Sequence, residues 1–439
     1  MSIKRTLLTS AVSFGLAAGI ASAESHATTI TIATVNNGDM VRMQGLMDDF
    51  NTKHPDINVE WVTLEENVLR QNLTTDISTG GGAYDVMTIG TYEVPIWAKN
   101  DWLVSLNEGM ADDFNAGDLL PAIAGGLTVD GNLYASPFYG ESSMVMYRTD
   151  LMEKAGLEMP DAPTWTFISE AAAAMTDRDN DINGICARGK AGWGENMAFL
   201  TAMSNSFGAR WFDEGWKAQF DSEAWATTLN FYLDMMNESG PSGAANNGFN
   251  ENLTLFQQGK CGMWIDATVA ASFVTGADST VADKVGFTLA PDNGLGPRGN
   301  WLWAWSLAIP ASSEKQDAAK AFISWATGPD YAALVAGNEG WANVPPGTRT
   351  SLYENEEYLT AAPFAQTTLD SILSADPTNP TVDPVPYTGV QFVAIPEFAG
   401  IATQVGQQFS DALAGNQTAA EALANAQALT VEEMEAAGY

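Results

Sequence analysis

The amino-terminal part of the chain alternates between short apolar runs and amphipathic segments. Residues 30–35, 57–64 and 84–89 are apolar runs of strand length, rich in β-branched residues. Residues 43–50 and 68–77 carry apolar side chains three or four positions apart, which is typical of helices. A strand–helix–strand–helix–strand order predicts a parallel sheet with right-handed crossovers.

A second set of alternating elements begins near Tyr139. We expect strands at 144–150, 184–187, 261–265 and 284–291, and helices at 168–175, 197–205 and 225–237. A further strand follows at 299–310, and helices are expected at 317–327 and just after Pro396, which suits a first helical turn. The pattern predicts an α/β protein, and a mature chain of about 415 residues exceeds what one core usually holds, so two domains are expected.

The strand at 299–310 reads GNWLWAWSLAIP and places Trp301, Trp303 and Trp305 at alternate positions. In an extended strand this spacing points all three indoles to one face. The row accounts for three of the 14 tryptophans of the chain. A buried core is one reading of such a row, and a wall of flat rings that covers the C–H face of a sugar is the other.

Polar side chains follow the first three predicted strands. Asn36 and Asn37 follow the first, Glu65 and Glu66 the second, and residues 90–92, including Tyr92, the third. Ligands of parallel α/β sheets bind beyond the carboxyl ends of the strands. These positions are therefore candidate ligand contacts, with ordinary solvated loops as the alternative.

The amino terminus has the organisation of an export signal. Lys4 and Arg5 precede an apolar stretch at 7–20 and a small-residue cleavage site at 21–23. The stretch is too short to span a bilayer, and no Cys follows it to accept a lipid anchor. We expect residues 1–23 to be removed and a freely diffusing, exported protein to begin near Glu24.

The chain is strongly acidic, with a formal net charge of −35. Without the signal segment, 54 acidic side chains face 17 basic ones, a net charge of −37. Such a surface repels phosphate backbones and anionic lipid, so nucleic-acid binding is not expected. Only two cysteines occur, Cys186 and Cys261, and in an oxidising compartment one disulfide and two buried thiols are equally open.

The sequence contains few residues or motifs that are typical of an enzyme active site. His26 lies beside the cleavage site and His54 at a helix end before a proline, which suits neither a catalytic triad nor a metal site. Residues 294–299 match G-x-G-x-x-G but lead into a strand, so no nucleotide cofactor is expected. Residues 179–190 resemble a calcium loop whose twelfth position is Lys190 rather than Glu, so an Asx-rich turn is preferred and no metal is expected.

Two carboxylates keep one enzymatic alternative open. Glu141 in PFYGESS and Asp266 in MWIDAT lie beside aromatic residues. A glycosidase needs only such a pair at a set separation. A carboxylate beside an aromatic ring also accepts hydrogen bonds from the hydroxyls of a bound sugar, and five clusters of this kind occur: YGESS, GWGENM, MWIDAT, WLWAW and GWANVPP.

At these motifs the chain resembles a known family, the periplasmic sorbitol/mannitol (polyol) binding proteins of ABC importers, within the extracellular sugar-binding proteins. The resemblance covers nearly the whole mature chain in the phrases EENVLRQ, DVMTIGTYEVPIW, PFYGESSMVMYRTDL, RGKAGWGENM, GFNENLTLF, GKCGMWIDATVAASF, WLWAWSLAIPASS, EGWANVPPGTRTSLY and PVPYTGVQFVAIPEF. It implies a two-lobed periplasmic-binding-protein fold of type II-like form, each lobe a mostly parallel sheet flanked by helices. It places residues 24–138 and 283–328 in the first lobe, and 139–282 and 329–439 in the second.

The resemblance also implies that the protein binds a solute and does not catalyse a reaction. The lobes would close on a polyol or related sugar, and the closed form would deliver it to membrane permease subunits, as a monomer with no cofactor. Trp303 would lie at the cleft, with Trp301 and Trp305 packed around it. The expected ligand contacts are Asn37, Glu65, Tyr92, Glu141, Arg188, Trp193, Asn196, Asp266, Trp303, Trp341 and Asn343. Among these, Glu141 and Asp266 would accept hydroxyl hydrogen bonds, Asn196 would donate and accept, and Trp193 and Trp341 would cover the carbon chain.

Overall fold

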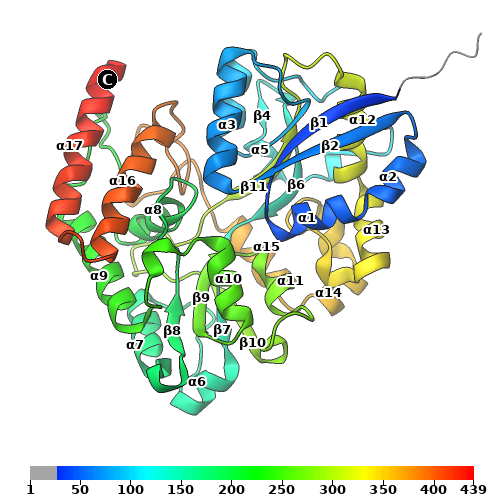
Figure 1. Cartoon of the computed structure of the whole chain (residues 1–439). Coiled ribbons are helices and arrows are strands. Elements are labelled where there is room, and N and C mark those ends of the chain that lie inside the picture. The colour runs from blue at the N-terminus through cyan, green and yellow to red at the C-terminus, as the bar shows by residue number, and fades with distance from the viewer. Residues whose placement is uncertain (1–26) are drawn as a thin grey trace, which may run out of the picture.

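Two lobes, each with its own sheet, make up the protein in the computed structural model, which describes residues 27–439 (Figure 1). The predicted export signal, residues 1–23, lies outside the described residues. The strands are β1 (Thr28–Val35), β2 (Ile57–Leu64), β3 (Val86–Ile89), β4 (Thr128–Val129), β5 (Asn132–Leu133), β6 (Ala135–Glu141), β7 (Ser143–Arg148), β8 (Asn183–Cys186), β9 (Cys261–Ala267), β10 (Val285–Leu289) and β11 (Trp303–Ala308).

The α-helices lie between and outside these strands. They are α1 (Gly38–Gly45), α2 (Met47–Lys53), α3 (Glu66–Thr79), α4 (Glu93–Lys99), α5 (Pro121–Gly125), α6 (Thr149–Ala155), α7 (Trp165–Met175), α8 (Asn196–Ser206), α9 (Glu223–Ser239), α10 (Phe249–Gln257), α11 (Ala270–Val274), α12 (Gln316–Thr327), α13 (Pro329–Glu339), α14 (Glu356–Ala361), α15 (Ala365–Leu373), α16 (Phe398–Leu413) and α17 (Ala419–Ala437). Within residues 27–439, none of them combines the length and apolarity that a membrane crossing needs.

The first lobe contains a five-stranded sheet of order β2-β1-β3-β11-β6. As the apolar runs predict, β1 is parallel to both β2 and β3. The tryptophan strand β11 is antiparallel to β3 and to β6, because it enters the sheet at the edge where β3 ends. The α/β class is therefore confirmed, and in this sheet β11 alone runs against the direction that the other four strands share.

The second lobe contains a four-stranded sheet of order β10-β7-β9-β8. Only β8 and β9 are parallel, whereas β7 runs antiparallel to β9 and to β10. Helices α16 and α17 pack on α8 and α9 along the outer side of this lobe (Figure 1). Most of its tryptophans form the core, since Trp165, Trp211, Trp225 and Trp264 are fully buried.

The sheets divide the chain at other places than the sequence predicts. Strand β6 stays in the first sheet as far as Glu141, beyond the predicted boundary at 138. Strand β10 pairs with β7 in the second sheet, so the chain returns to the first lobe after β10 rather than at 283. Tyr331 of α13 packs on Trp325 and Phe138 of the first lobe, with ring centroids 5.3 and 5.5 Å apart, so the chain past 328 begins in that lobe.

Three chain segments run side by side between the lobes. Ser142 Oγ donates a hydrogen bond of 2.6 Å to the carbonyl of Trp301, and Asn300 Nδ2 donates to Ser142 Oγ at 3.1 Å. The same Asn300 amide donates to the carbonyl of Ser371 and to Ser374 Oγ. A buried amide thus joins three segments that are far apart in the chain.

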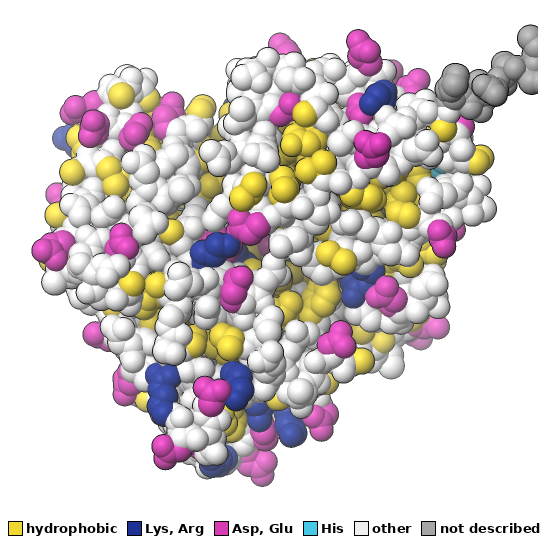
Figure 2. All heavy atoms as spheres, in the orientation of Figure 1, with side chains coloured by type: hydrophobic (Ala, Val, Ile, Leu, Met, Phe, Trp, Pro, Cys, Tyr) yellow, Lys and Arg dark blue, Asp and Glu magenta, His cyan; other side chains and the backbone are white. Residues whose placement is uncertain are grey.

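The surface agrees with the acidic composition. On the visible face, Asp and Glu side chains are scattered over both lobes, and Lys and Arg gather mainly at the tip of the second lobe around α6 (Figure 2). A hollow is visible between α3 on one side and α16 and α17 on the other (Figures 1 and 2).

Candidate ligand-binding site

A cleft between the lobes collects side chains from both sheets. The space within it is about 30 Å³. Its lining residues are Asn37, Glu66, Arg70, Glu141, Arg188, Trp193, Gly194, Ala198, Phe249, Ala267, Val269, Trp301, Trp303, Trp305 and Gln391.

Four indoles line the cleft, and one of them, Trp193, comes from the second lobe. Trp301, Trp303 and Trp305 all line it, whereas the sequence placed only Trp303 at the cleft with the other two packed around it. The Trp303 ring meets those of Trp305 and of Trp193 edge to face, at centroid distances of 5.5 and 5.7 Å. Trp303 is 4% exposed, and its indole N–H has no hydrogen-bond partner among residues 27–439. These indoles therefore offer both aromatic faces and a free donor.

The guanidinium of Arg70 lies among these rings. Its carbon is 3.9 Å from the ring centre of Trp193, 4.7 Å from that of Trp305 and 5.0 Å from that of Trp303. Glu66 and Glu93 hold it by ion pairs of 2.8 and 2.6 Å. Since Arg70 belongs to α3 and Trp193 to the second lobe, this cation–π contact crosses the cleft.

Arg188 is held on the second lobe by Asp266. Asp266 is fully buried in β9 and accepts hydrogen bonds from Arg188 Nε at 2.9 Å and from an Arg188 terminal nitrogen at 2.7 Å. It also accepts from Trp264 Nε1 at 3.1 Å. Burial lowers the pKa of Arg188, and the carboxylate of Asp266 raises it. The net shift is upward, so the guanidinium stays charged.

Glu141 occupies the end of β6, opposite Trp303 of β11 in the sheet register. It is 5% exposed and lines the cleft, and its carboxylate has no hydrogen-bond partner among the described residues. Burial raises the pKa of Glu141 well above its ordinary value; Asp266, Glu66 and Asp39 raise it further, and Arg188 lowers it. A side chain in this position can accept hydrogen bonds from a hydroxylated guest.

Glu195 is a second buried carboxylate close to the cleft. It lies 3.6 Å from Arg188 and 3.3 Å from Lys190. Burial raises its pKa to about 7, with Glu66 raising it as well and Arg188 and Lys190 lowering it. This group supports the cleft electrostatically without lining it.

The structure brings five of the eleven expected contacts together in the cleft: Asn37, Glu141, Arg188, Trp193 and Trp303. Asn37 precedes α1, and its amide donates a hydrogen bond of 2.9 Å to the hydroxyl of Tyr139.

Three other expected contacts lie directly behind the cleft wall. Tyr92 packs on Trp193, with ring centroids 4.9 Å apart, and its hydroxyl donates to the carbonyl of Ile395 at 3.0 Å. Asn196 donates to the carbonyl of Gly406 at 2.8 Å and fixes the start of α8. Asp266 positions Arg188 as described above. Each of these three side chains is placed to orient residues of the cleft.

Glu65 lies at the rim of the cleft rather than within it. Its carboxylate caps α3 by accepting from the backbone N–H of Asn67 at 3.2 Å, and it also pairs with Lys190 of the second lobe. Asn67 donates in turn to the carbonyl of Ala191 at 3.2 Å. The loop at 191–194 also comes close to Glu66 of α3. It carries glycine at 194, where a Cβ would overlap the carboxylate of Glu66.

Trp341 and Asn343 lie away from the cleft. Asn343 accepts a hydrogen bond of 3.1 Å from Arg42, and Trp341 borders a separate cavity of about 210 Å³ in the first lobe. Both therefore share the motif of an aromatic beside an amide without sharing the cleft.

Several cleft residues were not expected from the sequence: Arg70, Phe249, Val269 and Gln391. Glu66 and Arg70 are four positions apart on α3, and this pairing at the end of a strand was the one available signal. Gln391 lies in an irregular segment and bonds both backbone groups of Leu302, so no periodic pattern marks it.

A disulfide joins Cys186 to Cys261, with the two Cα atoms 5.8 Å apart. It links β8 to its parallel neighbour β9. Arg188 follows the first cysteine by two positions, and Asp266 lies on the strand that the second begins. The disulfide therefore braces the two strands that present the Arg188–Asp266 pair.

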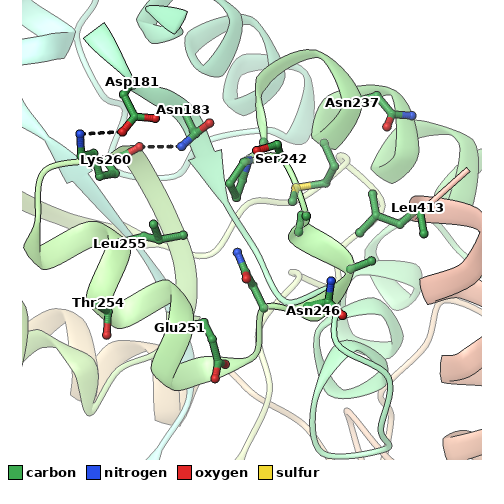
Figure 3. A pocket seen from close by; sticks show the side chains of 18 of the residues that line it. Asp181, Asn183, Asn237, Ser242, Asn246, Glu251, Thr254, Leu255, Lys260 and Leu413 are labelled. Carbon is green, nitrogen blue, oxygen red and sulfur yellow. Dashed lines mark hydrogen bonds and ion pairs between the residues drawn. The ribbon is translucent and has the colours of Figure 1, made fainter.

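A larger hollow of about 1020 Å³ lies at the outer side of the second lobe (Figure 3). Its polar rim includes Lys260, whose ammonium pairs with Asp181 at 2.7 Å, and Asn183, which donates to the carbonyl of Lys260 at 3.0 Å. This hollow is open and draws on one lobe only. We place the candidate site in the interlobe cleft, because unpartnered buried polar atoms and aromatic faces coincide there.

Comparison with known proteins identifies the family. The bacterial extracellular solute-binding protein family matches residues 36–333. A mannitol-binding protein of Pseudomonas aeruginosa is 55% identical over 414 residues, which cover 94% of each chain.

Solved structures agree with this match. An ABC transporter solute-binding protein from Agrobacterium vitis, with bound D-mannitol, is 69% identical and has a TM-score of 0.93, over 94% of this chain and all of that one. A ribitol complex from Agrobacterium radiobacter shares the fold, with 23% identity and a TM-score of 0.81 over 92% of this chain and 98% of that one. The chain therefore belongs to the bacterial extracellular solute-binding protein family.

Proposed function

We propose that this chain is the solute-binding component of an ABC importer and that it captures a mannitol-like hexitol between its lobes. The observation that carries the proposal is the likeness, at 69% identity, to a solute-binding protein with bound D-mannitol. The cleft chemistry supports it. Indole faces suit the C–H face of a carbon chain, and the Trp303 N–H and the Glu141 carboxylate suit its hydroxyls.

Capture requires the lobes to move. Residues of both lobes line the cleft, which holds a space of about 30 Å³ in this structure. The hexitol would enter while the lobes are apart and be enclosed when they rotate about the crossing segments near Asn300. Closure would then be stabilised by contacts that only the closed form completes.

The remaining features follow from this role. The protein would be exported to the periplasm, act as a monomer and present the enclosed solute to membrane permease subunits. It would not transform the solute. Asp266, one of the two carboxylates a glycosidase would use, is bound by Arg188, Trp264 and the backbone N–H of Ala267.

Calorimetric titration of the mature protein tests the proposal. D-mannitol, D-sorbitol, ribitol and maltose would be compared at pH 7.5, and each would be analysed for products after prolonged incubation. We expect one hexitol per chain, tighter binding of a hexitol than of maltose, and unchanged ligands. Absence of hexitol binding would refute the assigned solute, and product formation would refute the binding-only role.

A further inference from the structure

Every cation near the cleft is already matched by carboxylates of this chain. Arg70 is held by Glu66 and Glu93 at 2.8 and 2.6 Å. Arg188 lies 2.7 Å from Asp266 and 3.6 Å from Glu195. The guanidinium groups keep N–H donors for neutral hydroxyls, but their positive charge is compensated.

Lys190 completes the set at the rim, between Glu65 and Glu195. With Glu141 included, six carboxylates thus surround three cations: Glu65, Glu66, Glu93, Glu141, Glu195 and Asp266. Even if Glu141 and Glu195 are protonated, four carboxylates remain against three cations. Among the described residues at the cleft, no positive charge is left over for an anionic guest.

The environment of Glu141 shows how the cleft affects a carboxylate. It is buried in the wall without a hydrogen-bond partner among the described residues, and its pKa is raised well above the ordinary value despite Arg188. An anionic ligand enclosed beside it would lose its hydration in the same way and meet the same carboxylates.

We propose that the cleft selects uncharged polyols and excludes the sugar acids and sugar phosphates of the same carbon skeleton, because its carboxylates outnumber its cations. The inference rests on the proposed function, because it concerns the same cleft. It adds selection of the ligand by its charge to selection by its size and hydroxyl pattern. D-mannonate differs from D-mannitol by one oxidised terminal carbon, so it nearly preserves shape while adding one negative charge.

Calorimetric titration of the full mature chain with D-mannitol, D-mannonate and D-mannitol 1-phosphate at pH 7.5 tests this selection by charge. We expect both anions to bind at least about 100-fold more weakly than D-mannitol, since each is enclosed without a cation of its own. Binding of D-mannonate within about threefold of D-mannitol would overturn the proposal.

Two variants assign the effect to the cleft. Glu66→Gln and Glu93→Gln each remove one of the two carboxylates that hold Arg70, at nearly constant volume, and each should lower the mannitol-to-mannonate affinity ratio by at least about fivefold. Glu158→Gln makes the same change at an exposed position of the second lobe and should leave the ratio unchanged. Thermal melting verifies that each variant is folded. If both cleft variants keep the wild-type ratio, the proposal is wrong.

The outcome is separable from that of the proposed function. If D-mannitol fails to bind but another neutral polyol or sugar binds, the hexitol assignment is wrong, and the comparison of that ligand with its own aldonic acid decides whether the cleft selects by charge. If only an acid or phosphate binds, both proposals are wrong.

Discussion

Asp266 and Arg188 form a doubly hydrogen-bonded ion pair in the interior of the second lobe, with donor–acceptor distances of 2.9 and 2.7 Å. Arg188 is 6% exposed and also donates to the carbonyl of Gly194 at 2.7 Å. The pair thus ties β9 to the loop that carries Trp193. Because Arg188 lines the cleft and Asp266 does not, Asp266 acts on the ligand through Arg188.

Asp266→Asn should destabilise the protein strongly, because it leaves the Arg188 charge buried without its main partner. We expect the free energy of unfolding to fall by about 3–5 kcal/mol, measured by urea denaturation. Asp181→Asn breaks the exposed pair with Lys260 and should cost less than about 1 kcal/mol. Equal effects of the two substitutions would contradict the structural role of Asp266.

Trp303→Phe should weaken hexitol binding. The substitution removes the unpartnered indole N–H and part of the ring, which corresponds to about 1 kcal/mol, or roughly fivefold in Kd. Calorimetry with D-mannitol measures the effect. Trp216→Phe, in the second lobe and away from the cleft, is the matched control; a change in Kd as large as that of Trp303→Phe would remove Trp303 from the site.

The sequence predicted those parts of the site that strands deliver. Asn37 follows an apolar run, and the rule that ligands bind beyond the carboxyl ends of strands points to this position, which the structure places in the cleft lining. Glu141 and Trp303, which also line the cleft, were expected from their aromatic clusters and from the family resemblance. The first three strands and their parallel pairing also follow from the hydrophobic pattern, because a run of strand length has few alternatives.

Other residues could not be found in this way. Arg70 looks like an ordinary solvated side chain on α3, and only the approach of the second lobe buries it. Trp341 shares its motif with true cleft residues, yet its position depends on packing around α13. The pairing of β10 with β7 depends on contacts between residues far apart in the chain, so the local pattern could not assign it to a lobe.

The contact between Lys190 and Glu65 predicts a kinetic effect. It joins the lobes at the rim, and both side chains are partly exposed, at 28% and 36%. Lys190→Ala should therefore speed hexitol release by about two- to fivefold. The difference in release rate between the variant and the wild type should become smaller at high salt.

Stopped-flow measurement of hexitol dissociation checks this effect. Lys154→Ala, which removes an exposed pair with Asp177 within the second lobe, is the control and should leave the release rate unchanged. If Lys190→Ala releases the ligand no faster than the wild type, the rim contact does not hold the lobes together.

Reduction of the disulfide should lower stability. Cys186 and Cys261 are 75 positions apart, and a loop of this size gives a stabilisation of about 2–4 kcal/mol. Thermal unfolding with and without reductant measures the loss, and the double variant Cys186→Ala, Cys261→Ala should match the reduced protein. An unchanged melting temperature after complete reduction, verified by thiol titration, would contradict the bracing role of the disulfide.

Stability should fall as pH rises between about 5 and 7. Burial raises the pKa of Glu195 to about 7 and that of Asp39 to about 6, so both groups hold protons more tightly in the folded than in the unfolded chain. The unfolded chain then binds fewer protons in this range, and unfolding becomes easier as pH increases.

Glu195→Gln should flatten this dependence and make the protein more stable than the wild type at pH 8. Urea denaturation at several pH values measures both slopes, and the exposed Glu158→Gln substitution should leave the wild-type slope in place. A Glu195→Gln slope equal to that of the wild type would show that Glu195 is not the titrating group.

A crystal structure of the mature protein grown with D-mannitol tests the central claim most directly. We predict one hexitol between the lobes, with its carbon chain against the indoles of Trp193 and Trp303, its hydroxyls bonded to Glu141, and Arg188 still paired with Asp266. A hexitol bound instead in the outer hollow of the second lobe, with the interlobe cleft still filled by side chains, would contradict the account.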